Sequence, residues 1–258
     1  MKTVILAGGW GTRLGRLTEA IPKPMVLIGE RPILWHLMQL YSHYGFNDFV
    51  IAVGVNGHII KRYFHEYAMQ SADFTIDMTT GAVTVHGSSG VARWRVTVAD
   101  TGLNTLKGGR LKRVEQHLDD GLNMLTYGDG LADIDVGALV EFHRAHGKIL
   151  TLTGVRPPAR FGELIEEDGR LVDFVEKPQT SVGLINGGFM VFDRRLLTYL
   201  TPDETCDLEF GALERLTHDG QAMVYRHSGR WECMDHERDV SRLTRLWRDG
   251  EAFWKVWD

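Results

Sequence analysis

The feature that most constrains the fold is a short apolar run at residues 3–7 that ends directly in glycines. A run of this length without polar alternation is typical of a parallel strand buried on both faces. A helical pattern follows from Pro32 to Gly45, then an apolar run at 49–53, then a second helical pattern at 59–69. Strands and helices that alternate in this way predict a right-handed parallel arrangement, with helices on the faces of a sheet.

Short alternating segments interrupt this order twice. Residues 72–106 hold three of them, which predict an antiparallel insertion, and residues 161–192 hold another group. Elsewhere the pattern predicts helices at 111–118, 136–146, 208–217 and 240–247 and strands at 123–127 and 149–155. We therefore predict an α/β fold: one domain over residues 1–258 with a Rossmann-like mixed, mainly parallel sheet flanked by helices and carrying small β insertions.

Composition and charge exclude several classes of protein. The chain has 29 Lys and Arg against 34 Asp and Glu, a net charge of −5, which argues against a general nucleic-acid binder. Two cysteines are too few for a disulfide framework or a four-thiolate metal site. Neither a signal peptide nor a run of about 20 apolar residues is present, so we expect a cytoplasmic protein without membrane association. No zinc spacing occurs among the histidines, and His143 and His146 are expected to be a surface pair.

Glycines cluster at the carboxyl end of the first predicted strand. Ligands bind beyond this end of the strands in an open parallel sheet. Gly8, Gly9 and Gly11 would let backbone N–H groups approach a phosphate chain, and Arg13 would add a forked cationic donor. The spacing matches neither the dinucleotide fingerprint nor a P-loop. Taken alone, the glycines are explained equally well by a tight turn.

Three further charged residues suit a phosphate or metal site. Lys23 lies between two prolines, so we expect it to project from a stiff extended segment; the alternative is a solvated loop lysine. Asp129 lies between two glycines at the end of a predicted strand, where it could hold a divalent cation or be only a turn residue. Asp235 could be a second metal ligand, although a helix cap is the simpler interpretation. Asp135 is expected to cap the helix that begins at residue 136.

Together, these segments resemble the sugar-1-phosphate nucleotidyltransferase family. The segments that occur in the family's order are residues 6–14, 23–25, 128–129, 176–178 and 186–189. The chain most resembles the branch that makes CDP-glucose from CTP and glucose 1-phosphate, through residues 32–36, 96–102, 108–113 and 126–130. The resemblance covers essentially the whole chain. It implies Mg²⁺-dependent transfer of CMP, release of pyrophosphate, and a homo-oligomer.

The resemblance also implies a role for individual residues. The implied nucleotide-binding residues are Leu6, Ala7, Gly8, Gly9, Trp10, Gly11, Thr12, Arg13, Lys23, Thr105, Arg110 and Gly128. The implied sugar-phosphate-binding residues are Glu176, Lys177, Asn186 and Gly187. Mg²⁺ would be held by Asp129 and Asp235, and the catalytic residues would be Arg13, Lys23 and Asp129. About residues 1–130 would bind the nucleotide, and about residues 131–258 would bind the sugar phosphate and form the oligomer contacts.

Four segments depart from the family's pattern, and three of them flank the acceptor side and leave the acceptor open. Glu232 and Cys233 stand where the family has glutamine and proline, Glu163 where it has alanine, Gly211 where it has glutamate, and Lys107 where it has threonine. Two alternatives therefore remain. One is nucleotidyl transfer to another sugar phosphate or to a small phosphate or phosphonate ester. The other is a regulatory module that binds a nucleotide without catalysis, which has little need of two metal carboxylates.

Overall fold

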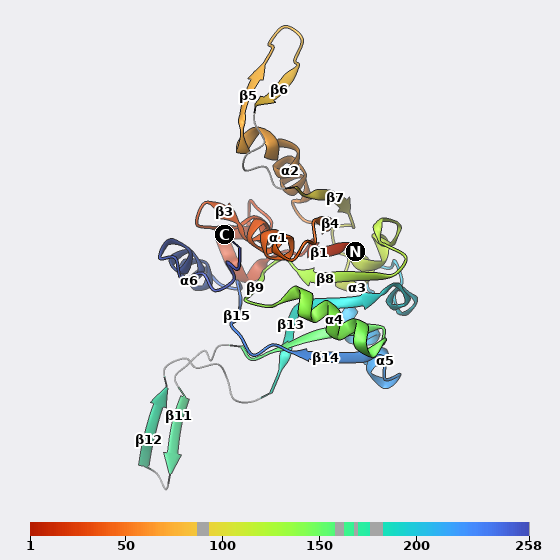
Figure 1. The fold of residues 1–258 in the computed structure, drawn as a ribbon, viewed down its shortest axis with the longest axis vertical. Helices are drawn as coiled ribbons and strands as arrows, with labels where there is room; N and C mark the ends of the chain where they lie inside the picture. Colours follow the sequence, from red (N-terminus) through yellow and green to blue (C-terminus); the bar gives the residue numbers. More distant parts are fainter. Residues whose placement is uncertain (87–92, 158–162, 168–169, 176–182, 258) are drawn as a thin grey trace.

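One central sheet determines where the other elements lie. A computed structural model describes residues 1–257 except 87–92, 158–162, 168–169 and 176–182. Seven strands form the sheet in the order β14-β10-β13-β8-β1-β4-β7 (Figure 1). β13 runs antiparallel to β8 and β10, and the other pairs are parallel. The strands are β1 (Thr3–Ala7), β4 (Asp48–Val53), β7 (Arg95–Asp100), β8 (Leu122–Tyr127), β10 (Leu150–Val155), β13 (Ile185–Asp193) and β14 (Ala222–Arg226).

Side-chain alternation along the strands directs residues into two cores, one on each face of the sheet. In β1, Ile5 packs with side chains of α1, α2, α4 and α6. Val4 and Leu6 pack on the opposite face with side chains of α3 and α5. Burial on both faces explains why β1 has the continuous apolar sequence of a central parallel strand. The helices are α1 (Ile33–His43), α2 (Gly57–Ser71), α3 (Lys107–Arg113), α4 (Val136–His146), α5 (Glu214–His218) and α6 (Glu237–Arg248).

Smaller elements complete the structure. Two hairpins project from opposite ends of the molecule, β5 (Asp73–Ile76) with β6 (Val83–His86) and β11 (Glu163–Glu167) with β12 (Arg170–Val175) (Figure 1). Two further antiparallel pairs are β2 (Leu27–Ile28) with β3 (Arg31–Pro32) and β9 (Gly130–Ala132) with β15 (Trp231–Cys233). The short helical turns are η1 (Thr12–Thr18), η2 (Lys23–Met25), η3 (Glu115–His117), η4 (Arg194–Tyr199) and η5 (Leu208–Leu213).

The predicted fold class is confirmed, because the sheet is mixed, mainly parallel and flanked by helices. Three expectations for individual elements are wrong. The third segment of the expected 72–106 insertion is β7, which pairs parallel with β4 at the edge of the main sheet. The helix expected at 111–118 begins at Lys107 and ends at Arg113. The helix expected at 208–217 is broken, because Gly211 has a φ of 113° inside η5.

Aromatic residues near the end of the chain pack in the core. Trp254 is fully buried and stacks on Trp247 with ring centroids 6.5 Å apart. His143 is also buried, and it and His146 both contact the hydroxyl of Thr151, so the expected surface pair is wrong. Among the described residues, no helix combines the length and apolarity that crossing a bilayer requires.

Candidate active site

A cleft of about 540 Å³ opens beyond the carboxyl ends of β1 and β8. This is the edge at which ligands bind in open parallel sheets. Asp129, Asn186 and Gly187 line the cleft, as does every residue predicted to bind the nucleotide: Leu6, Ala7, Gly8, Gly9, Trp10, Gly11, Thr12, Arg13, Lys23, Thr105, Arg110 and Gly128. Segments that are far apart in the sequence therefore meet around one cavity.

Packing requires glycine in the loop that follows β1. A Cβ on Gly8 would lie 2.2 Å from Nη1 of Arg110, a distance at which atoms clash. Gly11 has a φ of 65°, in the left-handed region that glycine adopts without strain. The loop is therefore a tight turn, as the simpler interpretation held. Its residues also line one wall of the cleft.

Arg110 holds this loop in place through hydrogen bonds to protein oxygens. Its Nη2 donates to the carbonyl of Gly8 at 2.8 Å, and its Nη1 donates to the carbonyl of Gly102 at 2.7 Å and the hydroxyl of Thr101 at 2.8 Å. The side chain is buried. A guanidinium engaged in this way fixes the loop relative to the sheet. Its hydrogen bonds favour a positioning role over direct contact with a phosphate.

Two carboxylates converge on one ammonium group in the cleft. Nζ of Lys23 lies 2.7 Å from Oδ2 of Asp129 and 2.6 Å from Oδ1 of Asp235. Nη1 of Arg13 lies 2.6 Å from the other carboxylate oxygen of Asp235. The pairing of β9 with β15 causes the convergence, because the backbone N–H of Met234 donates to the carbonyl of Asp129 at 2.9 Å.

The contacts of these residues exclude their simpler interpretations. Asp235 does not cap α6, because His236 is the N-cap and Asp239 closes the capping box. Lys23 is buried and doubly paired, not a solvated loop lysine. Its segment is also not extended as expected, since Lys23 begins the 3₁₀ turn η2. The cap predicted at Asp135 is confirmed, because its carboxylate accepts from the backbone N–H of Ala138 at 2.8 Å.

The ion pairs shift the pKa values of their members. Burial lowers the pKa of Lys23, but the opposing charge and hydrogen bond of Asp129 and the hydrogen bond of Asp235 raise it above its ordinary value. Burial raises the pKa of Asp235, but Lys23 and Arg13 lower it below its ordinary value. Lys23 therefore stays an ammonium ion and Asp235 a carboxylate at neutral pH.

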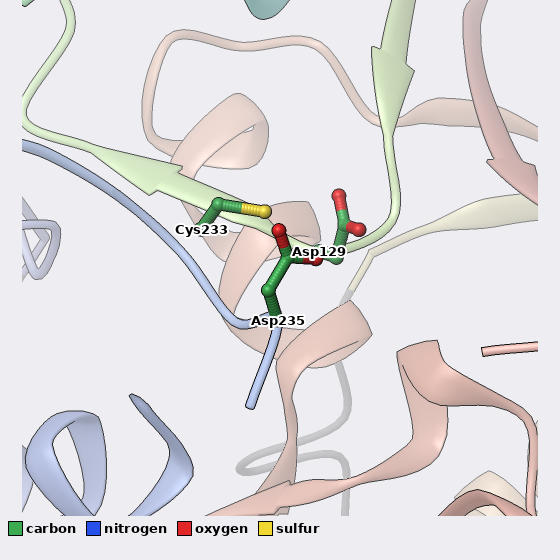
Figure 2. Close-up of side chains that lie close together, drawn as sticks. All are labelled: Asp129, Cys233 and Asp235. Carbon is green, nitrogen blue, oxygen red and sulfur yellow. The ribbon is translucent and has the colours of Figure 1, made fainter. Parts of the chain in front are cut away.

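The same cluster can hold a divalent cation. Asp129, Asp235 and Cys233 each offer one ligand atom, and these atoms lie within 4.8 Å of one another. Figure 2 shows the three side chains pointing toward one another. Burial raises the pKa of the Cys233 thiol, so the metal-free protein carries it protonated. Two carboxylates are the donors that a hard cation such as Mg²⁺ takes from proteins, so the donor set fits that ion.

A second group of polar side chains includes three that line the cleft, Lys107, Tyr127 and Asn186. The hydroxyl of Tyr127 donates to Oε1 of Glu209 at 2.6 Å and accepts from Nδ2 of Asn186 at 3.2 Å. Lys107 pairs with the same Glu209 oxygen, and its Nζ lies 5.3 Å from the centre of the Tyr127 ring. Within the described part of the chain, Oε2 of Glu209 is buried without a hydrogen-bond partner. We call these four residues the Tyr127 network.

Sequence reasoning assigned no role to three members of this network. Tyr127 adjoins the Gly128-Asp129 motif at the end of a predicted strand, which was an available signal. Glu209 and Lys107 belong to segments that depart from the family's pattern, but nothing in their spacing places them beside Tyr127.

Several predicted or singled-out residues lie elsewhere. Glu176 and Lys177 lie outside the described residues, as does the side chain of Glu163. Glu232 pairs with Arg242 of α6 at 2.9 Å and is not among the residues that line the cleft. Among the family departures with described side chains, Cys233 and Lys107 are therefore the ones that line the cavity.

Comparisons with known proteins agree with the geometry. Residues 2–250 match the family described as nucleotidyl transferase. The chain is 45% identical to a glucose-1-phosphate cytidylyltransferase of Salmonella typhi, over 100% of both chains. It is 40% identical to a probable glucose-1-phosphate cytidylyltransferase of Bacillus subtilis, again over 100% of both.

Solved structures share the fold at lower identity. HddC from Yersinia pseudotuberculosis has a TM-score of 0.69 at 21% identity, with 95% of this chain and 99% of that chain covered. A UDP-glucose pyrophosphorylase complexed with UDP-glucose has a TM-score of 0.67 at 15% identity, with 96% and 98% covered.

Proposed function

We propose, from the premise that this chain belongs to the nucleotidyl transferase family, that it transfers CMP from CTP to glucose 1-phosphate. The products are CDP-glucose and pyrophosphate. Relatives named for this activity align with the whole chain at 45% and 40% identity. The observation that carries the proposal is the convergence of Asp129 and Asp235 on Lys23, inside a cleft walled by the glycine-rich loop.

On the nucleotide side, the loop formed by residues 6–13 would cradle the triphosphate. Backbone N–H groups bind phosphate oxygens well where glycines allow a close approach. Asp235 pairs with both Lys23 and Arg13 beside this loop, which would put both cations next to the triphosphate and its leaving pyrophosphate. Thr105 and Gly128 line the same cavity, and Arg110 would position the loop.

The reaction joins two anions, which makes charge neutralisation and alignment the main requirements. A phosphate oxygen of glucose 1-phosphate attacks the α-phosphorus of CTP in line, and the bond to pyrophosphate breaks. Lys23 and Arg13 stabilise the charge that builds on the leaving group. The attacking phosphate is already ionised near pH 7, so neither a general base nor a protein nucleophile is required.

Asp129 and Asp235 are the residues that would hold Mg²⁺. The bound ion would supply neutralisation of the triphosphate charge. In the metal-free protein Lys23 and Arg13 together balance the charges of these carboxylates. When nucleotide binds, the ammonium group of Lys23 would leave the two carboxylates and pair with phosphate oxygens.

On the acceptor side, Asn186 and Gly187 line the cleft and would bind the sugar phosphate with Glu176 and Lys177. The Tyr127 network would face the acceptor and suits a polyhydroxyl ligand, because carboxylate and amide groups pair with hydroxyls. The division of the chain into a nucleotide-binding part, about residues 1–130, and an acceptor-binding part, about residues 131–258, stays a prediction.

A substrate panel tests this proposal. Pyrophosphate release is measured with each of the four nucleoside triphosphates, first with glucose 1-phosphate and then with other sugar phosphates and small phosphate or phosphonate esters. We expect release with CTP and glucose 1-phosphate. Release with a different acceptor would favour the alternative that the departures at Glu163, Gly211 and Glu232 motivate. CTP binding without release in any combination would favour the non-catalytic regulatory module.

The molecule also carries a surface suited to a homo-oligomer. The β5–β6 hairpin exposes Phe74, Ile76, Val83 and Val85, and an isolated hairpin of this kind is marginally stable in water. We propose that it packs on another copy of the chain, which departs from the expectation that about residues 131–258 form the oligomer contacts. Sedimentation velocity should then show an oligomer that Phe74→Asp dissociates; a wild-type monomer would contradict the proposal.

Both cysteines are unpaired, which fits the reducing cytoplasm.

A further inference from the structure

A cysteine thiol shares the carboxylate cluster of the cleft. Cys233 pairs with Gly130 in the β9–β15 register, directly beside Asp129, and it precedes Asp235 by two residues. Cys233 lines the cleft, so ions from solvent can reach it. Its sulfur and one oxygen from each aspartate lie within 4.8 Å of one another (Figure 2). The three donors are therefore held together by a backbone pairing.

We propose that Cys233, Asp129 and Asp235 form a site for a thiophilic divalent cation such as Zn²⁺ or Cd²⁺, in competition with Mg²⁺. Zn²⁺ takes sulfur and carboxylate oxygen as ligands in four-coordinate sites, and three protein ligands leave one position for water or a phosphate oxygen. Mg²⁺ takes oxygen ligands and retains several waters, so it gains nothing from the thiol. Cys233 should therefore strengthen the binding of thiophilic metals without strengthening the binding of Mg²⁺. On coordination the thiol proton leaves to solvent and a metal–sulfur bond replaces the S–H bond.

The positive group already present supports a cation at this position. The Lys23 ammonium lies 2.7 Å from one carboxylate and 2.6 Å from the other. It stands in for the cation that would bridge the two aspartates. Lys23 reaches the cluster through a flexible chain of four methylenes. An entering metal ion can displace its Nζ while the β9–β15 pairing stays intact.

A Cd²⁺ titration of the full-length, metal-free protein tests the sulfur ligand. The ultraviolet sulfur-to-cadmium charge-transfer band reports thiolate coordination directly. We expect the band to saturate at one equivalent in the wild type and in Cys206→Ser, and to be absent in Cys233→Ser. Cys206 is the matched control, because it is the other cysteine of the chain and accepts from the backbone N–H of Thr201 outside the cluster. A band that persists in Cys233→Ser, or is absent from the wild type, overturns the proposal.

Calorimetric titration then compares two metals in the same variants. Loss of a direct ligand should weaken Zn²⁺ binding by about 100-fold in Cys233→Ser, since loss of supporting groups alone costs 10- to 100-fold. Mg²⁺ affinity should stay within about threefold, because the oxygen donors remain. Equal Zn²⁺ affinity in Cys233→Ser and the wild type contradicts the assignment.

One measurement needs no substitution. Zinc-edge X-ray absorption of the wild-type protein should show one sulfur at about 2.3 Å beside oxygen donors. A coordination shell without sulfur overturns the proposal. All three experiments omit nucleotide and acceptor, so their outcomes are independent of whether the chain transfers a cytidylyl group.

Discussion

The two sides of the cleft are built in different ways. The side that we propose binds the nucleotide consists of a glycine-rich loop fixed by the buried Arg110 and of cations paired to Asp129 and Asp235. The side that we propose binds the acceptor is the Tyr127 network of longer side chains from separate elements, and one of its members, Glu209, keeps an oxygen without a partner among the described residues. Backbone geometry therefore shapes the glycine-rich side, whereas contacts between long side chains shape the other side.

The largest effect is expected from the charged centre of the nucleotide side. Asp129→Ala or Lys23→Ala should lower kcat by about 10³-fold or more, because each removes part of the charge stabilisation on which the reaction depends. The check is pyrophosphate release, with circular dichroism to verify folding. Asp120→Ala removes a fully exposed aspartate and should retain the wild-type rate. Near wild-type turnover of folded Asp129→Ala or Lys23→Ala would refute the assignment.

The next effect concerns the rigidity of the loop. Arg110→Ala should lower the free energy of unfolding by about 3 kcal/mol, because the carbonyls of Gly8 and Gly102 lose a charged donor in a buried place. Urea unfolding measures the change. Arg144→Ala is the control; it removes an exposed ion pair with Glu141 and should change stability by less than about 1 kcal/mol. Equal stability of Arg110→Ala and Arg144→Ala would show that Arg110 does not fix the glycine-rich loop.

A smaller and more selective effect is expected on the acceptor side. Glu209→Gln weakens the hydrogen bond from Tyr127 and removes the ion pair with Lys107, so the KM for glucose 1-phosphate should rise by about tenfold. The KM for CTP should not change. Initial rates with each substrate varied in turn separate the two constants. Glu214→Gln, an exposed change on α5, should alter neither. A rise in the KM for CTP instead would show that Glu209 affects nucleotide binding and would contradict its assignment to the acceptor.

The smallest effect is a titration. Burial raises the pKa of Asp235, but Lys23 and Arg13 bring it below its ordinary value of 3.8. The unfolded chain therefore takes up this proton first as the pH falls. The stabilisation is fully present above pH 3.8 and is lost as the pH falls through the lower folded pKa.

Lys23→Met should raise the pKa of Asp235 toward the unfolded value, so the stabilisation becomes smaller. Carboxyl-carbon NMR of the metal-free protein measures the shift, and Lys107→Met should leave the pKa of Asp235 unchanged. An unchanged value in Lys23→Met would show that Lys23 does not set it.

The sequence predicts the glycine-rich loop and its strand better than it predicts the contacts of Tyr127 and Glu209. The glycine-rich loop and β1 are recognisable because their signal lies within a dozen consecutive residues. β7 was misassigned because it is a half-exposed edge strand, whose alternation is the same in a parallel or an antiparallel pair. The contact of Glu209 with Tyr127 depends on a bend at Gly211 and on tertiary packing, and neither has a local pattern.

The β9–β15 pairing determines when the protein becomes competent during its own synthesis. Asp129 leaves the ribosome more than one hundred residues before Asp235, and the strand that unites them is among the last to emerge. A nascent or prematurely terminated chain can form most of the sheet and still lack half of the carboxylate pair. Incomplete translation products would therefore neither sequester divalent ions at this place nor consume nucleotide.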